Sequence, residues 1–374
     1  MRAHWANCIT HFDEEVKTFI ADYFGRSDRS CLLVAGAGFD PRTQIVSARL
    51  ASALGPRLSA IYVREERGNP AANLVARANA NEARLRTQVP NAQVIEVPIF
   101  ALDGAPVGGT NLAGELRKIA WPSDITDVVL DTSALSMGIA FPTARLLLQR
   151  CEAVPNINMH VIVASNPSLD VAIVGEPADR AIPVRGFAGD GRNLGGARAA
   201  RIWLPQLAPR AAPVLEKIRQ ALDDVYKVCP ILPFPAENPR HADELITEFS
   251  QQIQNEWDVD SRDLIYVSEW NPLDSYRTIS MLKQRYDRTV AGVYEPQLVL
   301  SPIGSKVMAI GSLMAAIDHD LTVQYVETLR YELRERTVGT TEPREKMVHV
   351  WLHGPVYAGF PGLSPDRSHV ASAT

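Results

Sequence analysis

Two short segments combine glycine, hydroxyl and charged side chains in spacings that could bind an anion. The first is Gly36-Ala-Gly38-Phe-Asp40-Pro-Arg42, which follows an apolar run and precedes a helical pattern. Glycine lets the backbone approach a ligand closely, and the N-terminus of a helix favours anionic or polar groups. A GxGxxG fingerprint would need glycine at position 41, which is proline, so a classical NAD site is disfavoured.

The second segment is Ser301-Pro-Ile-Gly304-Ser305-Lys306-Val-Met308, also a turn ahead of a predicted helix. Backbone N–H groups, the hydroxyls of Ser301 and Ser305 and the ammonium of Lys306 could converge on one phosphate or carboxylate. The pattern GxxxxGK[ST] is absent, so this segment is not a P-loop. An ordinary helix cap remains the alternative interpretation.

Four other groups of residues could take part in a site. Arg240, like Arg42, begins a predicted helix directly after an Asn-Pro or Asp-Pro pair, and Glu269 follows a predicted strand. Each arginine could instead pair with a structural carboxylate. Asp127 and Asp131 flank a strand, where Asp131 is either a reactive carboxylate or a cap. The pair His349 and His353 shares one face of a predicted strand, but no carboxylate lies at metal-ligand spacing, so we assign no metal site. We also assign no catalytic residue.

The composition is that of an ordinary globular protein. The 374 residues are 46% hydrophobic and 22% charged, which excludes a wholly disordered chain, a coiled coil and a collagen-like fibre. A net charge of -5 speaks against a broad surface for duplex nucleic acid. The four cysteines form no CxxC pair, the N-terminus is too polar for a signal peptide, and no apolar stretch is long enough for a bilayer. We therefore expect a cytoplasmic protein without membrane contact.

Short apolar strands alternate with helical patterns along most of the chain, which predicts an α/β fold with mainly parallel sheets. The predicted units are an N-terminal helix (1–30), a first Rossmann-like half (31–200), a second Rossmann-like half (201–360) and a disordered tail (361–374). Residues 165–200 are rich in Gly, Pro and Arg and are predicted to be the loop between the halves.

The two halves show similar motifs in the same order, which predicts an internal duplication. The segment 38–42 aligns with 236–240, 61–65 with 265–269, 128–133 with 298–303, and 159–163 with 321–325. The turn of the first half at 131–136 lacks the glycine and lysine of its counterpart, so a ligand bound symmetrically by both halves is not expected.

The first segment resembles the SAM-binding turn of leucine-carboxyl-type methyltransferases, which follows the pattern G-A-G-x-D-x-R. The resemblance covers about thirty residues. It implies that Gly36 and Gly38 approach the methionine part of SAM and that Arg42 binds its carboxylate. Glu65 or Glu66 would hold the ribose hydroxyls.

The second segment resembles the G-[ST]-K-x-M-x-x-[AG] turn of CARF-type Rossmann-like domains, which sense oligonucleotides in prokaryotic defence systems. Gly304, Ser305, Lys306 and Met308 match that pattern. The resemblance implies a ligand at the carboxyl ends of the strands, across the interface between two similar halves.

These observations lead to a ranked set of functions. The favoured one is a non-catalytic bacterial protein that binds or senses a small anionic, nucleotide-like ligand in antiviral defence, with a protein partner from the same operon as a further expectation. The alternatives are a SAM-dependent methyltransferase and a ligand-free subunit of a larger complex. The sequence does not name a cofactor. The expected ligand-binding residues are Gly36, Gly38, Asp40, Arg42, Arg240, Glu269, Ser301, Gly304, Ser305 and Lys306.

Overall fold

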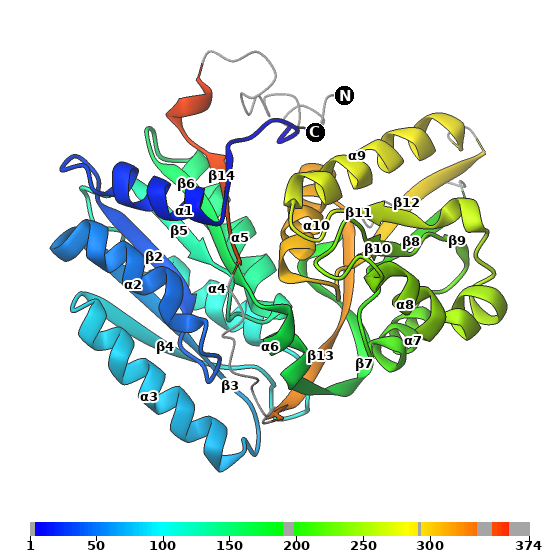
Figure 1. Cartoon of the computed structure of the whole chain (residues 1–374), viewed down its shortest axis with the longest axis horizontal. Coiled ribbons are helices and arrows are strands. Elements are labelled where there is room, and N and C mark those ends of the chain that lie inside the picture. Colours follow the sequence, from blue (N-terminus) through cyan, green and yellow to red (C-terminus); the bar gives the residue numbers. More distant parts are fainter. Residues whose placement is uncertain (1–3, 190–197, 291–292, 335–345, 359–374) are drawn as a thin grey trace.

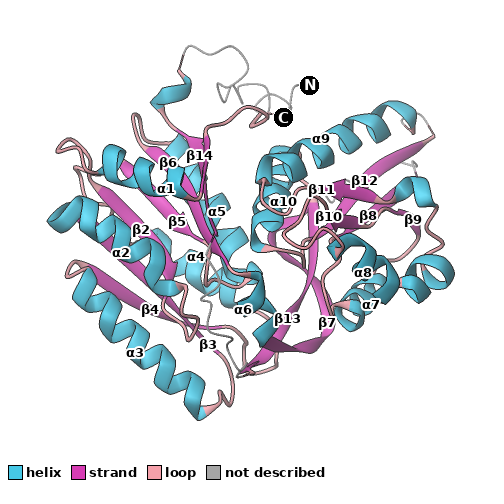
Figure 2. Ribbon diagram, in the orientation of Figure 1, coloured by secondary structure: helices cyan, strands magenta, loops and turns pink. Residues whose placement is uncertain are grey.

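The chain forms two α/β halves that lie side by side (Figure 1). A computed structural model describes residues 4–189, 198–290, 293–334 and 346–358. In Figure 2 each half shows strands flanked by helices, so the predicted α/β class with mainly parallel sheets is confirmed. The tail of residues 361–374, predicted to be disordered, lies outside the described residues. No helix in the described part of the chain is long and apolar enough to cross a membrane.

The sheet of the first half has the order β1-β14-β6-β5-β2-β3-β4. The five strands from β6 to β4 are parallel, β14 is antiparallel to β6, and β1 is antiparallel to β14. Their bounds are β1 (Thr10–Phe12), β2 (Cys31–Gly36), β3 (Leu58–Glu66), β4 (Ala92–Pro98), β5 (Asp127–Asp131), β6 (Asn158–Ser165) and β14 (Lys346–His353).

The sheet of the second half has the order β7-β13-β12-β8-β9, in which only β7 is antiparallel to its neighbour. Two further strands form a small parallel sheet of their own. The bounds are β7 (Ile173–Ala188), β8 (Arg198–Pro205), β9 (Val225–Val228), β10 (Ile231–Pro233), β11 (Ile265–Val267), β12 (Tyr294–Ser301) and β13 (Thr322–Leu333).

One hydrophobic core runs through both halves and includes side chains of α5 and α10, which lie between the two sheets (Figure 1). Two smaller cores lie on the outer faces, one in each half. The helices are α1 (Glu14–Phe19), α2 (Thr43–Leu54), α3 (Ala72–Gln88), α4 (Gly108–Lys118), α5 (Met137–Glu152), α6 (Pro167–Ala172), α7 (Ala212–Ala221), α8 (His241–Glu248), α9 (Pro272–Thr289) and α10 (Lys306–Asp318). Shared burial makes the two halves one packed unit.

Two strands were assigned to one half from the sequence but belong to the sheet of the other half. Residues 173–188, expected within a boundary loop of the first half, form β7 of the second sheet. This edge strand accommodates Pro177 and Pro183 because proline is tolerated where one side of a strand is unpaired. Residues 346–353, expected in the second half, form β14 inside the first sheet, where β1 and β6 cover both of its edges.

The N-terminal region is helical only in part. The predicted helix of 1–30 begins at Glu14 and continues as a π-helical turn over Ile20–Phe24, whereas Thr10–Phe12 form β1. Pairing of β1 with β14 supplies backbone hydrogen bonds that a helix could not make there, so the tertiary contact prevails over the helical spacing of Trp5, Ile9 and Phe12.

The predicted internal duplication is not confirmed. The matched pairs of strands do lie side by side, since β10 pairs with β11 as β2 does with β3, and β12 pairs with β13 as β5 does with β6. However, β10 and β11 form a two-stranded sheet that meets the end of β8 through a bridge between Gln206 and Ile231, and β8 occupies the place beside β12 that β2 occupies beside β5. The sequence match therefore does not extend to the order of the strands.

Candidate functional site

A cavity of about 660 Å³ lies between the two halves, at the carboxyl ends of the parallel strands. Small-molecule sites in proteins typically have volumes of about 300–1,000 Å³ and combine apolar walls with a few polar groups. Both sequence motifs contribute to this inter-half cleft. The polar or glycine residues that line it include Gly38, Asp40, Arg42, Glu65, Arg67, Thr132, Ser136, Asp170, Glu269, Gly304, Ser305, Lys306 and Glu327.

Two strand-to-helix turns, one from each half, meet at the floor of the inter-half cleft. Lys306, the first residue of α10, donates from Nζ to the carbonyl oxygen of Leu135, 3.1 Å away, in the turn between β5 and α5. Burial, followed by the nearby charge of Arg42, lowers the pKa of Lys306. An ammonium in such a place gains from an anionic partner, and it has two N–H bonds beyond the one that Leu135 accepts.

Two hydroxyls in the turn that Lys306 contacts have no hydrogen-bond partner among the described residues. They are Thr132 Oγ1 and Ser136 Oγ, both buried and both on residues that line the inter-half cleft. Thr132 is only 7% exposed. Buried polar atoms nearly always have partners, so these two hydroxyls mark a place for a ligand group or ordered water.

Arg42 lies in the inter-half cleft, but its guanidinium is fully engaged by carboxylates. It binds Asp40 through Nε and Nη2, with Nη2–Oδ2 at 2.7 Å, and Asp170 through Nη1, also at 2.7 Å. Burial alone would lower the pKa of Arg42, but the bonds and charges of Asp40 and Asp170 raise it above the usual value. The alternative of a structural ion pair therefore describes Arg42 better than direct contact with a ligand.

A second ion-pair cluster joins the two halves. Arg67, just after β3, binds Glu65 at 2.8 Å and Glu327 of β13 at 3.0 Å. Glu65 also accepts from the backbone N–H of Ser136, 2.8 Å away. Glu65 is thus occupied by protein groups, as is Glu66, which binds Arg64 at 2.8 Å. The cluster fixes the distance between β3 and β13 across the inter-half cleft.

The remaining glycines and hydroxyls of the two motifs divide into lining and structural residues. Gly38 lines the inter-half cleft with open space where a Cβ would stand, whereas Gly36 ends β2 against the carbonyl of Ala134 and is not in the lining. Ser305 caps α10, because its Oγ accepts from Met308 N at 3.2 Å. Ser301 is fully buried, accepts from Trp203 Nε1 at 2.9 Å, and does not line the cavity.

Glu269 and Arg240 have different places. Glu269 is 4% exposed, lines the inter-half cleft, accepts from the backbone N–H of Glu237 at 3.1 Å and lies 3.6 Å from Nδ1 of His241. Arg240 is the N-cap residue of α8, has an exposed side chain and is not among the lining residues, although its backbone N–H binds Asn238 as that of Arg42 binds Asp40. The two Pro-Arg turns thus share local geometry but not a common site.

Sequence reasoning did not select the hydroxyls of Thr132 and Ser136 or the cluster around Arg67. The turn Thr132-Ser-Ala-Leu-Ser136 was available as a signal, because it is rich in hydroxyls and follows a buried strand. Its lack of glycine and lysine made it look like a degenerate copy, whereas Lys306 reaches it from the other half.

Comparisons with known proteins identify no family for this chain. No family model matches, and no curated protein matches. Solved structures that superpose on parts of the chain include a human methyltransferase 10 domain containing protein, with 9% sequence identity over 43% of this chain and 71% of that chain and a TM-score of 0.23. Another is a candidate rRNA-methylase from Clostridium thermocellum, with 12% sequence identity over 42% of this chain and 86% of that chain and a TM-score of 0.23. A candidate universal stress protein from Pseudomonas aeruginosa UCBPP-PA14 matches more of the chain, with 10% sequence identity over 82% of this chain and 96% of that chain and a TM-score of 0.24. At these TM-scores the superpositions carry no argument about function.

Asp131, at the end of β5 below the two hydroxyls, gives a prediction about pH. Burial raises its pKa to about 6, against 3.8 for an ordinary aspartate, although Ser133 donates to its carboxylate. The folded state then holds this proton more tightly than the unfolded state, so the carboxyl group makes the fold less stable as the pH rises. We expect Asp131→Asn to gain stability relative to wild type as the pH rises from about 4 to about 6, by up to about 3 kcal/mol. Urea denaturation at each pH measures this difference, and a constant difference would contradict the assignment.

Proposed function

We propose that the protein binds a small anionic, nucleotide-like ligand in the inter-half cleft and acts as a sensor in a prokaryotic defence system. The observation that carries the proposal is the contact of Lys306 from the second half with Leu135, in the turn of the first half that also carries Thr132 and Ser136, all of which line the inter-half cleft. One ammonium and two hydroxyls without protein partners form a set of donors suited to phosphate oxygens.

The surroundings of these donors support the same ligand chemistry. Lys306 is the first residue of α10, and the N-terminal ends of helices attract anions. The walls also carry Phe39 and Tyr331, whose ring centroids are 5.6 Å apart across the inter-half cleft. An anionic group at the floor and an aromatic base near these rings would both find complementary partners.

The role in defence is supported by the segment Gly304–Met308, whose sequence is similar to the turn of CARF-type domains. Methyl transfer stays a prediction that the same experiment addresses. Its expected use of Arg42 and Glu65 as SAM ligands would require both side chains to leave their present ion pairs. We therefore rank SAM below a ligand anchored on Lys306.

Isothermal titration of the whole protein tests the proposal, with inorganic phosphate, mononucleotides, linear and cyclic oligoadenylates, and SAM as the injected compounds. We expect at least one phosphate-bearing compound to bind, and Lys306→Met to weaken that binding about 10- to 100-fold. Arg240→Ala, which removes an exposed cation outside the lining, is the matched control and is expected to bind like wild type.

Each outcome of that titration bears on the proposal. Equal affinity of Lys306→Met and wild type would place the ligand elsewhere. Binding of SAM alone would favour the methyltransferase alternative, and the absence of heat from every compound with folded protein would overturn the proposal.

A further inference from the structure

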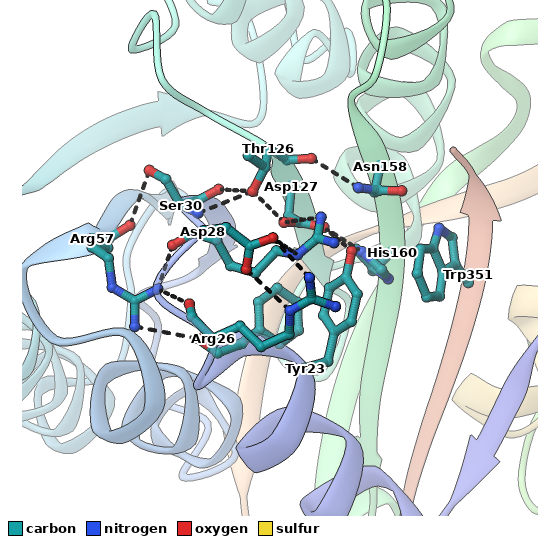
Figure 3. Close-up of polar contacts among 12 residues, drawn as sticks. Tyr23, Arg26, Asp28, Ser30, Arg57, Thr126, Asp127, Asn158, His160 and Trp351 are labelled. Atoms are coloured by element: carbon teal, nitrogen blue, oxygen red, sulfur yellow. Dashed lines mark hydrogen bonds and ion pairs between the residues drawn. The ribbon is translucent and has the colours of Figure 1, made fainter. Parts of the chain in front are cut away.

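Away from the inter-half cleft, an aspartate and three histidines form a continuous chain of hydrogen bonds across four neighbouring strands. Asp127 Oδ1 lies 3.1 Å from His160 Nε2, His160 Nδ1 lies 2.9 Å from His349 Nε2, and His349 Nδ1 lies 2.9 Å from His11 Nδ1. Figure 3 shows the inner end, where Asp127 and His160 meet near Tyr23 and Trp351. We call these four residues the histidine relay.

Aromatic rings enclose the histidine relay on its way through the protein. Asp127, His160 and His349 are each 0% exposed, whereas His11 at the outer end is half-buried. Phe19 stacks on His349 with ring centroids 4.3 Å apart, and Trp351 lies 4.7 Å from His160. Solvent therefore meets this chain of bonds at His11 among the described residues.

The carboxylate fixes the direction of every bond when all three histidines are neutral. Asp127 accepts from Tyr23 and Thr126, so it accepts from His160 Nε2 as well. A neutral His160 then accepts at Nδ1 from His349 Nε2–H, and a neutral His349 accepts at Nδ1 from His11 Nδ1–H. His11 is thereby held with its proton on Nδ1, the less common position in water.

One additional proton can enter without breaking any of these contacts. A proton that binds to Nε2 of His11 lets its Nδ1 proton pass to His349 Nδ1, and the Nε2 proton of His349 passes to His160 Nδ1. The products are a neutral His11 with its proton on Nε2, a neutral His349 and an imidazolium at His160 beside the Asp127 carboxylate. All three bonds persist with two of them reversed, and the new charge is paired.

A second proton has no such arrangement. It would leave two N–H groups facing each other at His11–His349 or at His349–His160, and a buried N–H group without an acceptor is unfavourable. Burial and the neighbouring histidines lower the pKa of His349 well below the usual value, and burial lowers that of His11. The sheet contact between β1 and β14 is where this repulsion is relieved, because β1 is a short edge strand.

The strand released at that contact belongs to a segment that ties the two halves together. Residues 4–12, which we call the N-terminal strap, bind the second half through Trp5 N to Tyr276 Oη at 2.8 Å and Ala6 O to Arg277 Nε at 2.7 Å. The strap binds the first half through Trp5 Nε1 to the carbonyl oxygen of Leu352 at 2.8 Å and through the pairing of β1 with β14.

We propose that the histidine relay is a proton-operated clasp, which accepts one proton with reversal of its bonds and releases the N-terminal strap when a second proton arrives. The charged and titratable groups that face it from the elements around it include Glu15 of α1, Tyr23 of the π-helical turn and Arg29 before β2. Cys31 of β2 and Cys151 of α5 also face Asp127, beside the relay members themselves. The Asp127 carboxylate at the inner end is what allows the first proton to be retained.

Nuclear magnetic resonance on wild-type protein labelled with ring-¹⁵N histidine tests the direction of the bonds, and variants are needed only to assign the resonances. At about pH 8 we expect His11 to carry its proton on Nδ1 and His349 on Nε2, and both tautomers to exchange as one proton is taken up. Resonances are assigned with His11→Gln, and His353→Gln of the same strand serves as the control outside the histidine relay. A His11 with its proton on Nε2 at about pH 8 would overturn the proposal.

Hydrogen exchange read by mass spectrometry tests the release of the N-terminal strap. After correction for the intrinsic rate, protection of residues 10–12 is expected to stay constant through the first proton uptake. Below that step it should fall about tenfold per pH unit for each further proton that the open form binds. His11→Gln should remove the dependence on pH, because an amide cannot take the second proton, whereas His353→Gln should keep it. Protection that persists while His11 and His349 both become imidazolium would refute the clasp.

Discussion

Gly311→Ala is expected to lower the free energy of unfolding by about 3 kcal/mol, because α10 packs on α9 with no room for a side chain at this position. A Cβ at Gly311 would stand 2.3 Å from the carbonyl oxygen of Pro272 and 2.7 Å from Cβ of Ser275. Both obstacles are parts of α9 that cannot rotate away, so the two helices must separate. Since α10 begins at Lys306, its displacement should also weaken any ligand bound at the floor of the inter-half cleft.

Gly114→Ala is the matched control for this substitution. Gly114 is likewise inside a helix, α4, but nothing lies within 4 Å of the place where its Cβ would stand. Replacing glycine by alanine in an open helical position stabilises a protein by about 0.5–1 kcal/mol. Chemical denaturation should therefore show that the free energy of unfolding changes in opposite directions in the two variants. A Gly311→Ala variant as stable as wild type would show that α9 and α10 are packed more loosely than described.

Asp127→Ala is expected to lower the free energy of unfolding by about 3–5 kcal/mol, the range found when one member of a buried charged network is removed. The carboxylate of Asp127 accepts hydrogen bonds from Tyr23 at 2.9 Å, Thr126 at 2.5 Å and His160 at 3.1 Å. Alanine would leave Tyr23 and His160 without this acceptor, and each such loss is unfavourable, whereas Thr126 can still donate to the carbonyl oxygen of Ser30, 3.0 Å away.

Two further substitutions separate charge from position in this experiment. Asp127→Asn keeps one acceptor oxygen and should lose about half as much stability, but it cannot pair with an imidazolium at His160. Asp124→Ala, three residues earlier and exposed, should change stability by no more than about 0.5 kcal/mol. Thermal and urea denaturation measure all three, and an Asp127→Ala variant within the range of Asp124→Ala would contradict the network.

The pH dependence of the Asp127 contribution has a definite sign. Burial works to raise the pKa of Asp127, but the bonds from His160, Thr126 and Tyr23 outweigh it and lower the pKa below 3.8. The unfolded chain therefore takes up a proton before the folded state does, and the stabilisation is present above that pH and lost as the pH falls further. The difference in stability between wild type and Asp127→Asn should shrink in acid for this reason.

The alternation of strands and helices was predictable because buried parallel strands are continuous apolar runs. Cys31–Gly36 and Asp127–Asp131 are buried throughout and were recognisable as strands. β7 was not, because an edge strand pairs on one side only and its residues are partly exposed with interspersed proline and glycine. The place of β14 was equally hidden, since a run of apolar residues does not reveal which of two sheets it will join.

The candidate site was predictable where local turn chemistry determines it. Gly38, Gly304, Ser305 and Lys306 were selected from their sequence and do line one cavity. What the pattern could not show is which charges neutralise one another, because Arg42 meets Asp170 from a segment 128 residues away. The role of His349 was hidden for the same reason, since its partners His11 and His160 come from strands that only the fold brings together.

The late return of β14 to the first sheet has a consequence for synthesis on the ribosome. Chains are made from the N-terminus, at about 5–20 residues per second, and N-terminal units ordinarily fold while the rest is still being made. In this protein the strand between β1 and β6 lies at Lys346–His353, after every strand of the second sheet. The nascent first half must therefore wait, with an unprotected edge at β6, until residues 346–353 have been synthesised. Chaperone demand and premature termination should accordingly affect the first half more than the second.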